Sequence, residues 1–189
     1  MASVKNSIVT RKFKGLLGDE VVFRQWEGKT VVAKAPEARE GDPTPAQAQL
    51  QERFLLASRY AKSVIKNADK SLAEAYAEAL KPRQNVYSRA LADFMSLPEI
   101  KVIDVRQYKG AVGGKIITRA LDDFRVKSVR VEVYAANGTL LEEGDAVQND
   151  NGLDWTCTAT QANNLLTGSK IKATATDVPG NEGMLEVTL

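Results

Sequence analysis

The sequence predicts an α+β protein in which a β-hairpin and short helices precede an all-β sandwich. Three patterns lead to this prediction: two β-rich runs around a glycine loop near the start, apolar residues every three or four positions over residues 45–95, and apolar–polar alternation from Glu99 onward. A spacing of three or four residues between apolar positions is typical of helices, and apolar–polar alternation is typical of half-buried strands. The change of period divides the chain into residues 1–98 and 99–189, each long enough for a small domain.

The hairpin is predicted within residues 7–35. Its two β-rich runs, residues 21–26 and 30–33, flank the loop Glu27-Gly28-Lys29, which is a typical hairpin pattern. Residues 8–10 are a further candidate strand. A lone hairpin is only marginally stable in water, so this one needs a partner surface.

A linker is predicted over residues 36–45, where four turn-forming residues are set in a charged stretch: Pro36, Gly41, Pro43 and Pro45. It would let the hairpin reach away from the rest of the chain. The two edges of a hairpin carry unpaired backbone donors and acceptors, which invite strand addition on a neighbouring subunit.

In that arrangement, alternate side chains of the hairpin would supply specificity. The candidate partner-binding residues are therefore Val22, Arg24 and Trp26. The alternative is that the hairpin folds back on the first helix and buries Phe23 or Trp26 against Phe54. The sequence leaves both arrangements open.

The first helix begins at a clear signal. Thr44 is the expected N-cap, Pro45 suits the first helical position, and Gln47 completes a capping box. The helix is predicted to end at the Asn67-Ala68-Asp69 break. Its apolar residues share one face and are expected to point inward: Leu50, Phe54, Ala57, Ala61, Val64 and Ile65.

Two shorter helices follow. The second is capped near Ser71 and stopped by Pro82, and the third runs from about Asn85 to Met95. The second is expected to turn three side chains inward: Leu72, Tyr76 and Leu80. The third is expected to turn four inward: Val86, Ala90, Leu91 and Phe94.

The remaining sequence alternates in steps of two. Apolar residues alternate with polar ones at Val129, Val131 and Val133, and again at Ile171, Ala173 and Ala175. Asn137-Gly138 between two β runs is a strong hairpin signal. Six or seven short strands with regular turns predict a sandwich, in which Trp155 is the expected filler beside Val131 and Ile171.

The segment from Val126 to Gly183 resembles the bacterial immunoglobulin-like domains repeated in surface adhesins. The matching runs are residues 128–134, Asn137-Gly138, residues 151–155 and residues 171–181, the last ending in an Asp-x-x-Gly-Asn turn. The resemblance implies an immunoglobulin-like sandwich that binds or spaces and has no catalytic residues. The chain departs from an ordinary adhesin in having a single copy and no secretion signal.

Residues 15–66 resemble a family of uncharacterised proteins from gut bacteria and their phages, which also join a hairpin and helices to a β domain. The matching runs are residues 18–23, Gly28-Lys29, residues 44–54 and residues 60–62. The family carries no known activity, so this resemblance implies an architecture only.

Catalytic chemistry is poorly represented. The chain has no histidine, which is the commonest acid–base group and metal ligand. Its single cysteine, Cys157, allows neither an intrachain disulfide nor a cysteine–metal cluster, and its strand-like context indicates a small hydrophobic residue. We therefore expect no enzyme and assign no catalytic, cofactor or metal residue.

Three weaker alternatives remain. Turn residues Asp122, Asp123, Asp177 and Asn181 would suit Ca²⁺ if they gathered, although such residues also stabilise turns. The run 110–115 has glycines like a phosphate loop but lacks the required spacing.

The third alternative is single-stranded nucleic acid, bound beside Phe13 and Trp26. The basic residues concerned are Arg11, Lys12, Lys14, Arg24 and Lys29. Solvated strand faces explain them equally well, and nucleic acid is not favoured.

The start of the chain, residues 1–6, leads into no apolar run of signal-peptide length, and no stretch is long enough to insert in a membrane. The net charge of +2 indicates no particular partner. We expect a virion protein if the chain is phage-encoded and a cytoplasmic protein otherwise.

The function expected from these patterns is a structural component of a larger assembly, such as an auxiliary capsid or head–tail component of a phage. Its partners would be protein subunits, in a homo-oligomer or a multi-protein particle. The alternative is a protein- or glycan-binding immunoglobulin-like module of a bacterial cell. An enzyme with a carboxylate site is a third and weaker possibility.

Overall fold

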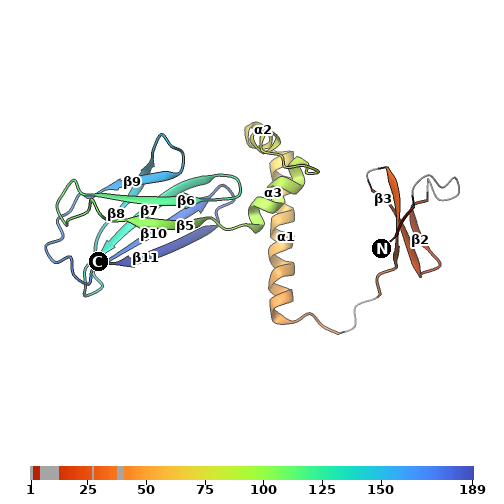
Figure 1. Ribbon diagram of the computed structural model, residues 1–189, viewed down its shortest axis with the longest axis horizontal. Coiled ribbons are helices and arrows are strands. Elements are labelled where there is room, and N and C mark those ends of the chain that lie inside the picture. Colours follow the sequence, from red (N-terminus) through yellow and green to blue (C-terminus); the bar gives the residue numbers. More distant parts are fainter. Residues whose placement is uncertain (1, 5–12, 27, 38–40) are drawn as a thin grey trace. The chain divides into compact units, whose positions relative to one another are not determined.

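The computed structural model describes residues 2–4, 13–26, 28–37 and 41–189 (Figure 1). The protein is α+β, as predicted, and divides into two compact units: unit 1 is residues 1–44 and unit 2 is residues 45–189. The boundary predicted after residue 98 falls inside unit 2. The helices and the large sheet thus belong to one unit, for reasons given below.

Unit 1 is a four-stranded antiparallel sheet in the order β1-β4-β3-β2. The strands are β1 (Ala2–Val4), β2 (Gly15–Leu17), β3 (Val21–Trp26) and β4 (Lys29–Lys34). β3 and β4 form the predicted hairpin, with Val22 opposite Ala33 and Arg24 opposite Val31. The strand predicted at residues 8–10 lies outside the described residues.

The prediction that both edges of the hairpin are unpaired is wrong. β2 pairs along β3, and β1 pairs along β4, so each hairpin strand already has a second neighbour. The outer edges of the sheet are therefore β1 and β2, which are three residues long. Edges this short offer few free backbone groups to another strand.

The described side chains of the unit 1 sheet form almost no core. Among its described side chains only Thr30 is buried, and its hydroxyl accepts a hydrogen bond from Gln25 Nε2 at 2.8 Å. Phe13, Leu16 and Leu17 are exposed. The described side chains of this sheet therefore contribute little apolar burial to its folding.

Unit 2 opens with three helices: α1 (Pro45–Lys66), α2 (Ser71–Glu78) and α3 (Val86–Met95). The bounds of α1 and α3 agree with the predicted signals, whereas α2 has Lys70 rather than Ser71 at its N-cap position and ends at Glu78, before Pro82. At the start of α3, the Asn85 side chain accepts a hydrogen bond from the Ser88 backbone N at 2.8 Å, while Ser88 Oγ accepts one from the Asn85 backbone N at 2.9 Å. This reciprocal pair fixes where α3 begins. Among the described residues, no helix is long and apolar enough to cross a membrane.

The inward face predicted for α1 is only partly buried. Ala57, Ala61 and Val64 are buried, but Leu50, Phe54 and Ile65 are exposed. For Leu50 and Phe54, near the start of α1, the reason is length: α1 has 22 residues and its neighbour α3 has 10, so α3 can cover only about half of α1 at 1.5 Å per residue. Leu80, predicted to point inward, is also exposed, because it lies beyond the end of α2.

The large sheet of unit 2 has seven antiparallel strands in the order β11-β10-β7-β8-β9-β6-β5. They are β5 (Glu99–Asp104), β6 (Lys115–Leu121), β7 (Val126–Tyr134), β8 (Leu140–Gln148), β9 (Asp154–Thr158), β10 (Lys170–Asp177) and β11 (Glu182–Thr188). β8 pairs with β7 along most of its length and with β9 only through Val147 and Gln148. β11 also contacts β5, so the first and last strands of the order meet and the sheet nearly closes.

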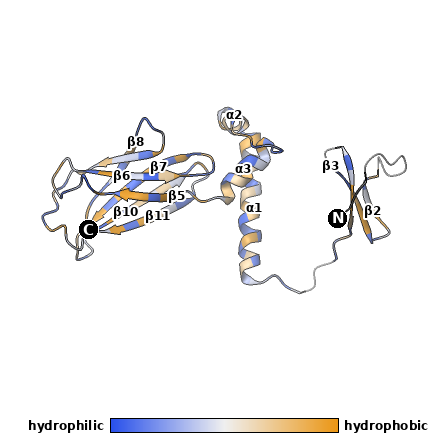
Figure 2. Ribbon diagram, viewed as in Figure 1, coloured by the Kyte–Doolittle hydropathy of each residue, from blue (hydrophilic) through white to orange (hydrophobic). Residues whose placement is uncertain are grey.

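The alternation predicted for the strands is confirmed, and Figure 2 shows apolar and polar residues alternating along them. The alternating residues of β7 and β10 are buried: Val129, Val131, Val133, Ile171, Ala173 and Ala175. Trp155 is 7% exposed and belongs to the same buried cluster as Val131 and Ile171, as predicted. Asn137-Gly138 turns the chain between β7 and β8, where Gly138 has a φ of 84°.

The helices are attached to the sheet by buried polar contacts. Arg89 of α3 is buried and donates from Nη2 to the Asp123 carbonyl at 2.6 Å, from Nη1 to the Asp123 carboxylate, and from Nε to the Ala79 carbonyl at 3.0 Å. Asn181 Nδ2 donates to the carbonyls of Phe94 and Ser96, each at 3.2 Å. These contacts join α3 to the sheet, and α1 joins the same unit because its Ala61 and Val64 are buried in one cluster with Tyr76 and Ala90.

The seam between β11 and β5 has no room for a side chain at Gly183. A Cβ atom there would lie 1.8 Å from the Pro98 carbonyl oxygen, just before β5 begins. That oxygen belongs to the backbone and cannot rotate away. The absence of a side chain at Gly183 therefore allows the two strands to approach.

We expect Gly183→Ala to lower the free energy of unfolding by about 2–3 kcal/mol, because the strands must separate to admit the methyl group. Urea unfolding followed by circular dichroism measures this. Gly144→Ala in β8 is the matched control: its Cβ would meet only Cys157 Sγ, at an ordinary 3.6 Å. Equal stability of the two variants would show that the seam is not tightly packed.

Candidate functional site

Unit 1 contains the residues predicted to bind a partner. Val22 and Arg24 occupy alternate positions in β3 and therefore lie on the same side of the sheet. Trp26 pairs through its backbone with Lys29, and its side chain lies outside the described part of the structure. The structure thus places Val22 and Arg24 together; whether they bind a partner stays a prediction.

Neighbouring strands extend this surface. Leu16 of β2 and Ala33 of β4 lie opposite Val22, and Val31 lies opposite Arg24. We call the surface formed by Leu16, Val22, Arg24, Lys29, Val31 and Ala33 the sheet face. Leu16 is 56% exposed, and Arg24 and Lys29 are exposed. The sheet face has an apolar centre with two cations, which suits an apolar partner surface that carries negative charge.

A second apolar surface lies on α1. Leu50, Gln51, Phe54, Leu55, Ser58 and Met95 line a groove of about 560 Å³, which we call the α1 groove. Leu50 and Phe54 are four residues apart, as are Gln51 and Leu55, so they form two adjacent rows along the helix. Phe54 is 53% exposed. The sequence indicated the apolar row but not its exposure, because exposure depends on the length of α3.

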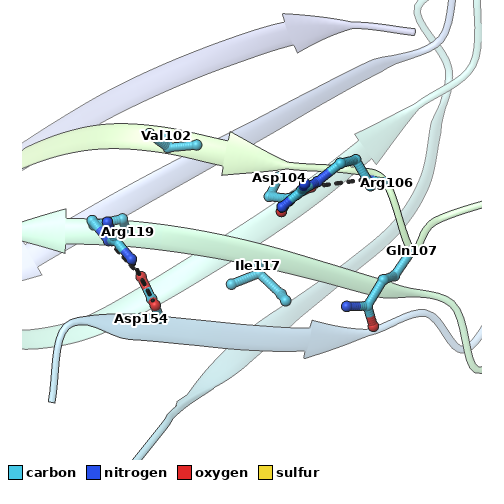
Figure 3. Close-up of a pocket in the computed structure, with 7 residues that line it drawn as sticks. All are labelled: Val102, Asp104, Arg106, Gln107, Ile117, Arg119 and Asp154. Carbon is cyan, nitrogen blue, oxygen red and sulfur yellow. Dashed lines mark hydrogen bonds and ion pairs between the residues drawn. The ribbon is translucent and has the colours of Figure 1, made fainter. Parts of the chain in front are cut away.

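A third feature is a polar hollow of about 380 Å³ on β5, β6 and β9 (Figure 3). It is lined by Val102, Asp104, Arg106, Gln107, Ile117, Arg119 and Asp154. Arg119 donates from Nε and Nη2 to the two Asp154 carboxylate oxygens at 2.7 and 3.0 Å. Arg106 likewise donates from Nε to Asp104 Oδ1 at 3.0 Å and from Nη2 to Asp104 Oδ2 at 2.6 Å. The sequence did not single out these residues.

Each ion pair of the hollow has no net charge, because its carboxylate is ionised and balances the arginine. Hydrogen bonds from Arg106 lower the pKa of Asp104 to about 2, and those from Arg119 lower the pKa of Asp154. The carboxylates are therefore ionised at neutral pH, and each arginine has its counter-charge. Such a hollow offers fixed hydrogen-bonding groups beside Val102 and Ile117, which suits a neutral polar ligand better than an ion.

The acidic turn residues proposed for Ca²⁺ are engaged in turns. Asp177 accepts hydrogen bonds from the backbone N of Gly180 and Asn181 at 2.7 and 2.6 Å. Asp122 accepts two from the turn that follows it, and Asp123 pairs with Arg89 and Lys81. Among the described residues, no three acidic or thiol side chains are arranged to hold a metal ion. The turn interpretation accounts for the contacts of Asp122 and Asp177, whereas Asp123 forms ion pairs with Arg89 and Lys81.

The remaining candidates offer little chemistry. Burial raises the pKa of the Cys157 thiol, with Glu142 and Asp145 adding to the effect, which is the opposite of activation. The glycine-rich run 110–115 leads into strand β6 rather than a helix, as its sequence predicted. Arg11 and Lys12 of the proposed basic patch lie outside the described residues, so that patch stays a prediction.

A buried acid lies between the three helices and the large sheet. The Asp93 side chain is fully buried; its Oδ2 accepts a hydrogen bond from the Tyr76 hydroxyl at 2.6 Å, while its Oδ1 has no partner among the described residues. The Tyr76 and Tyr60 hydroxyls lie 2.9 Å apart. Burial raises the pKa of Asp93 to about 7, and the nearby Asp122 and Asp177 add to this increase. The sequence gave no sign of this cluster.

Comparison with known proteins gives little further information. No family model and no curated protein matches the chain. One similar solved structure is the crystal structure of an engineered protein, 23% identical over 53% of this chain, with a TM-score of 0.31. The match covers 21% of that protein's chain.

Proposed function

We propose that this protein is a non-enzymatic structural component of a larger assembly, and specifically a phage virion protein such as an auxiliary capsid or head–tail component. One observation carries the proposal: unit 1 is a folded sheet with a single buried residue, Thr30, among its described side chains. Folding must offset roughly 1–2 kcal/mol of backbone entropy per ordered residue. A sheet that cannot do this from its own core depends on contact with another surface.

The exposed apolar residues also support an assembly role. Leu16 and Leu17 in unit 1, and Leu50 and Phe54 in unit 2, are exposed. Contiguous apolar surface on a protein is typical of a binding face. Two such faces on one chain suit a subunit that contacts several neighbours.

The architecture of unit 2 supports a spacing role. We propose that its large sheet is an immunoglobulin-like sandwich: seven antiparallel strands enclose a core that includes Trp155, and β8 passes from a partner on one side to a partner on the other. A closed β domain of this kind presents its neighbours at a fixed separation.

The test compares the full chain with residues 45–189. We expect the full chain to form oligomers and the truncated chain to be a monomer. The truncated chain should keep the circular-dichroism signal of the large sheet, because unit 2 contains its own core. Light scattering after size-exclusion chromatography gives the masses, and circular dichroism checks the fold. An equal oligomeric state for both chains would contradict the proposed role of unit 1. A virion role further predicts that the gene lies beside capsid, portal and tail genes.

A second candidate is a glycan-binding module. It is favoured by the polar hollow, where two fixed arginine–carboxylate pairs flank Val102 and Ile117. Sugar hydroxyls hydrogen-bond well to such planar groups. This candidate predicts that residues 45–189 retain ligand binding as a monomer, so the truncated chain distinguishes it from the assembly role.

A further inference from the structure

We propose that the sheet face of one copy packs into the α1 groove of a second copy. This inference rests on the proposed assembly role and names the partner surface. It joins two surfaces of the same chain that are each apolar, partly exposed and built on regular secondary structure. The partner is thus another copy of this chain.

The two surfaces are matched in chemistry. The sheet face presents Leu16, Val22 and Val31, and the α1 groove presents Leu50, Phe54 and Leu55. Phe54 can serve as an anchor that inserts between apolar side chains, a common feature at the centre of interfaces. Burying these side chains would give unit 1 the core that its described residues lack.

Charge also favours the match. Arg24 and Lys29 lie on the sheet face, and Glu52, which does not line the groove, is exposed on α1 one turn before the groove residue Leu55. Each of these three side chains has no ion-pair partner within the described part of the chain. Opposite charges at the edge of an apolar contact steer the two surfaces into register.

The contact would be heterologous, because every copy carries both surfaces. Within one copy, the segment from Ala35 to Thr44 connects unit 1, which carries the sheet face, to unit 2, which carries the α1 groove. Fully extended, this segment spans about 33 Å at 3.3 Å per residue. A copy that inserts its own sheet face into a neighbour still has its groove free to receive another. Such contacts form closed rings or open filaments, which are the arrangements a repetitive particle requires.

Complementation between two full-length variants tests the proposal. Val22→Asp disables the sheet face, and Phe54→Asp disables the α1 groove. We expect each variant alone to be a 20.6 kDa monomer. An equimolar mixture should contain dimers of twice that mass, because the groove of the Val22→Asp chain is intact and the Phe54→Asp chain supplies an intact sheet face. Sedimentation velocity measures the masses.

Two further variants keep the test decisive. Val147→Asp, at a position that is 73% exposed on β8 and outside both surfaces, should assemble like the unchanged chain. If Val22→Asp loses strand content by circular dichroism, Arg24→Glu takes its place, because Arg24 is exposed. A mixture in which both variants stay monomeric would overturn the proposal.

The outcomes also separate this inference from the proposed function. If residues 45–189 are monomeric but Phe54→Asp assembles like the unchanged chain, unit 1 binds elsewhere: docking in the groove is refuted and the assembly role stands. If the unchanged full chain is itself a monomer, self-assembly and the docking proposal both fail.

Discussion

Replacing Trp155 by alanine is expected to lower the free energy of unfolding by about 3–5 kcal/mol. The indole lies in the centre of the large sheet, 7% exposed, in one buried cluster with Val131 and Ile171. Replacing it loses the free energy gained by burying the largest side chain of that cluster. It also leaves a cavity that the paired strands cannot move to fill. Urea unfolding followed by far-ultraviolet circular dichroism measures the loss.

A matched control is Leu165→Ala, since Leu165 is 79% exposed in a loop of the same unit. That variant should stay within about 0.5 kcal/mol of the unchanged chain. A loss below about 1 kcal/mol for Trp155→Ala would mean that the ring does not fill the core.

Raising the pH from 5 to 8 is expected to destabilise unit 2 by about 2–3 kcal/mol through Asp93. The pKa of this acid is about 7 in the folded chain and 3.8 when unperturbed. Between these two values the folded state holds a proton that the unfolded state has released, so stability falls as the pH rises through 7. A difference of about three pKa units corresponds to about 4 kcal/mol at most.

The charged and titratable groups around Asp93 come from every neighbouring element. Tyr60 of α1 and Tyr76 of α2 form the hydroxyl chain, Arg89 of α3 opposes the increase in pKa, and Asp122 and Asp177 reinforce it. Ionisation therefore adds a negative charge near those of Asp122 and Asp177, while Arg89 is already paired with the Asp123 carboxylate. This explains why burial rather than an ion pair decides the pKa.

Asp93→Asn should be more stable than the unchanged chain at pH 8 and should lose most of the pH dependence between 5 and 8. The amide keeps an oxygen for the Tyr76 hydroxyl and never ionises. Asp69→Asn is the control: hydrogen bonds from Ser71 lower the pKa of Asp69, so its own dependence lies below pH 4. If Asp93→Asn retained the slope of the unchanged chain, another group would be responsible.

Local signals in the sequence predicted local structure well. The Thr44-Pro45 start of α1, the break after Lys66 and the alternation of Val129 to Val133 depend only on nearby residues, and all three predictions agree with the structure. The edge strands were missed because β1 and β2 are three residues long, too short to establish a period. The exposed part of α1 was missed because it depends on a different helix.

The polar contacts were beyond sequence analysis for another reason. Arg89 and Asp123 are 34 positions apart, Arg119 and Asp154 are 35 apart, and Asn181 and Phe94 are 87 apart. Their meeting depends on strand order and register, and a single sequence reveals neither. The candidate surfaces could thus be predicted in part, but the hollow and the buried acid could not.

The meeting of β5 and β11 sets an order for folding during translation. β5 begins at residue 99 and β11 at residue 182, so the ribosome must release the whole intervening chain before the pair can form. Until then the backbone edge of β5 has no neighbour on that side, and contacts between residues so far apart in sequence form slowly. A nascent chain of this protein therefore carries an open strand edge through most of the second half of its synthesis, when a holding chaperone would be of most use.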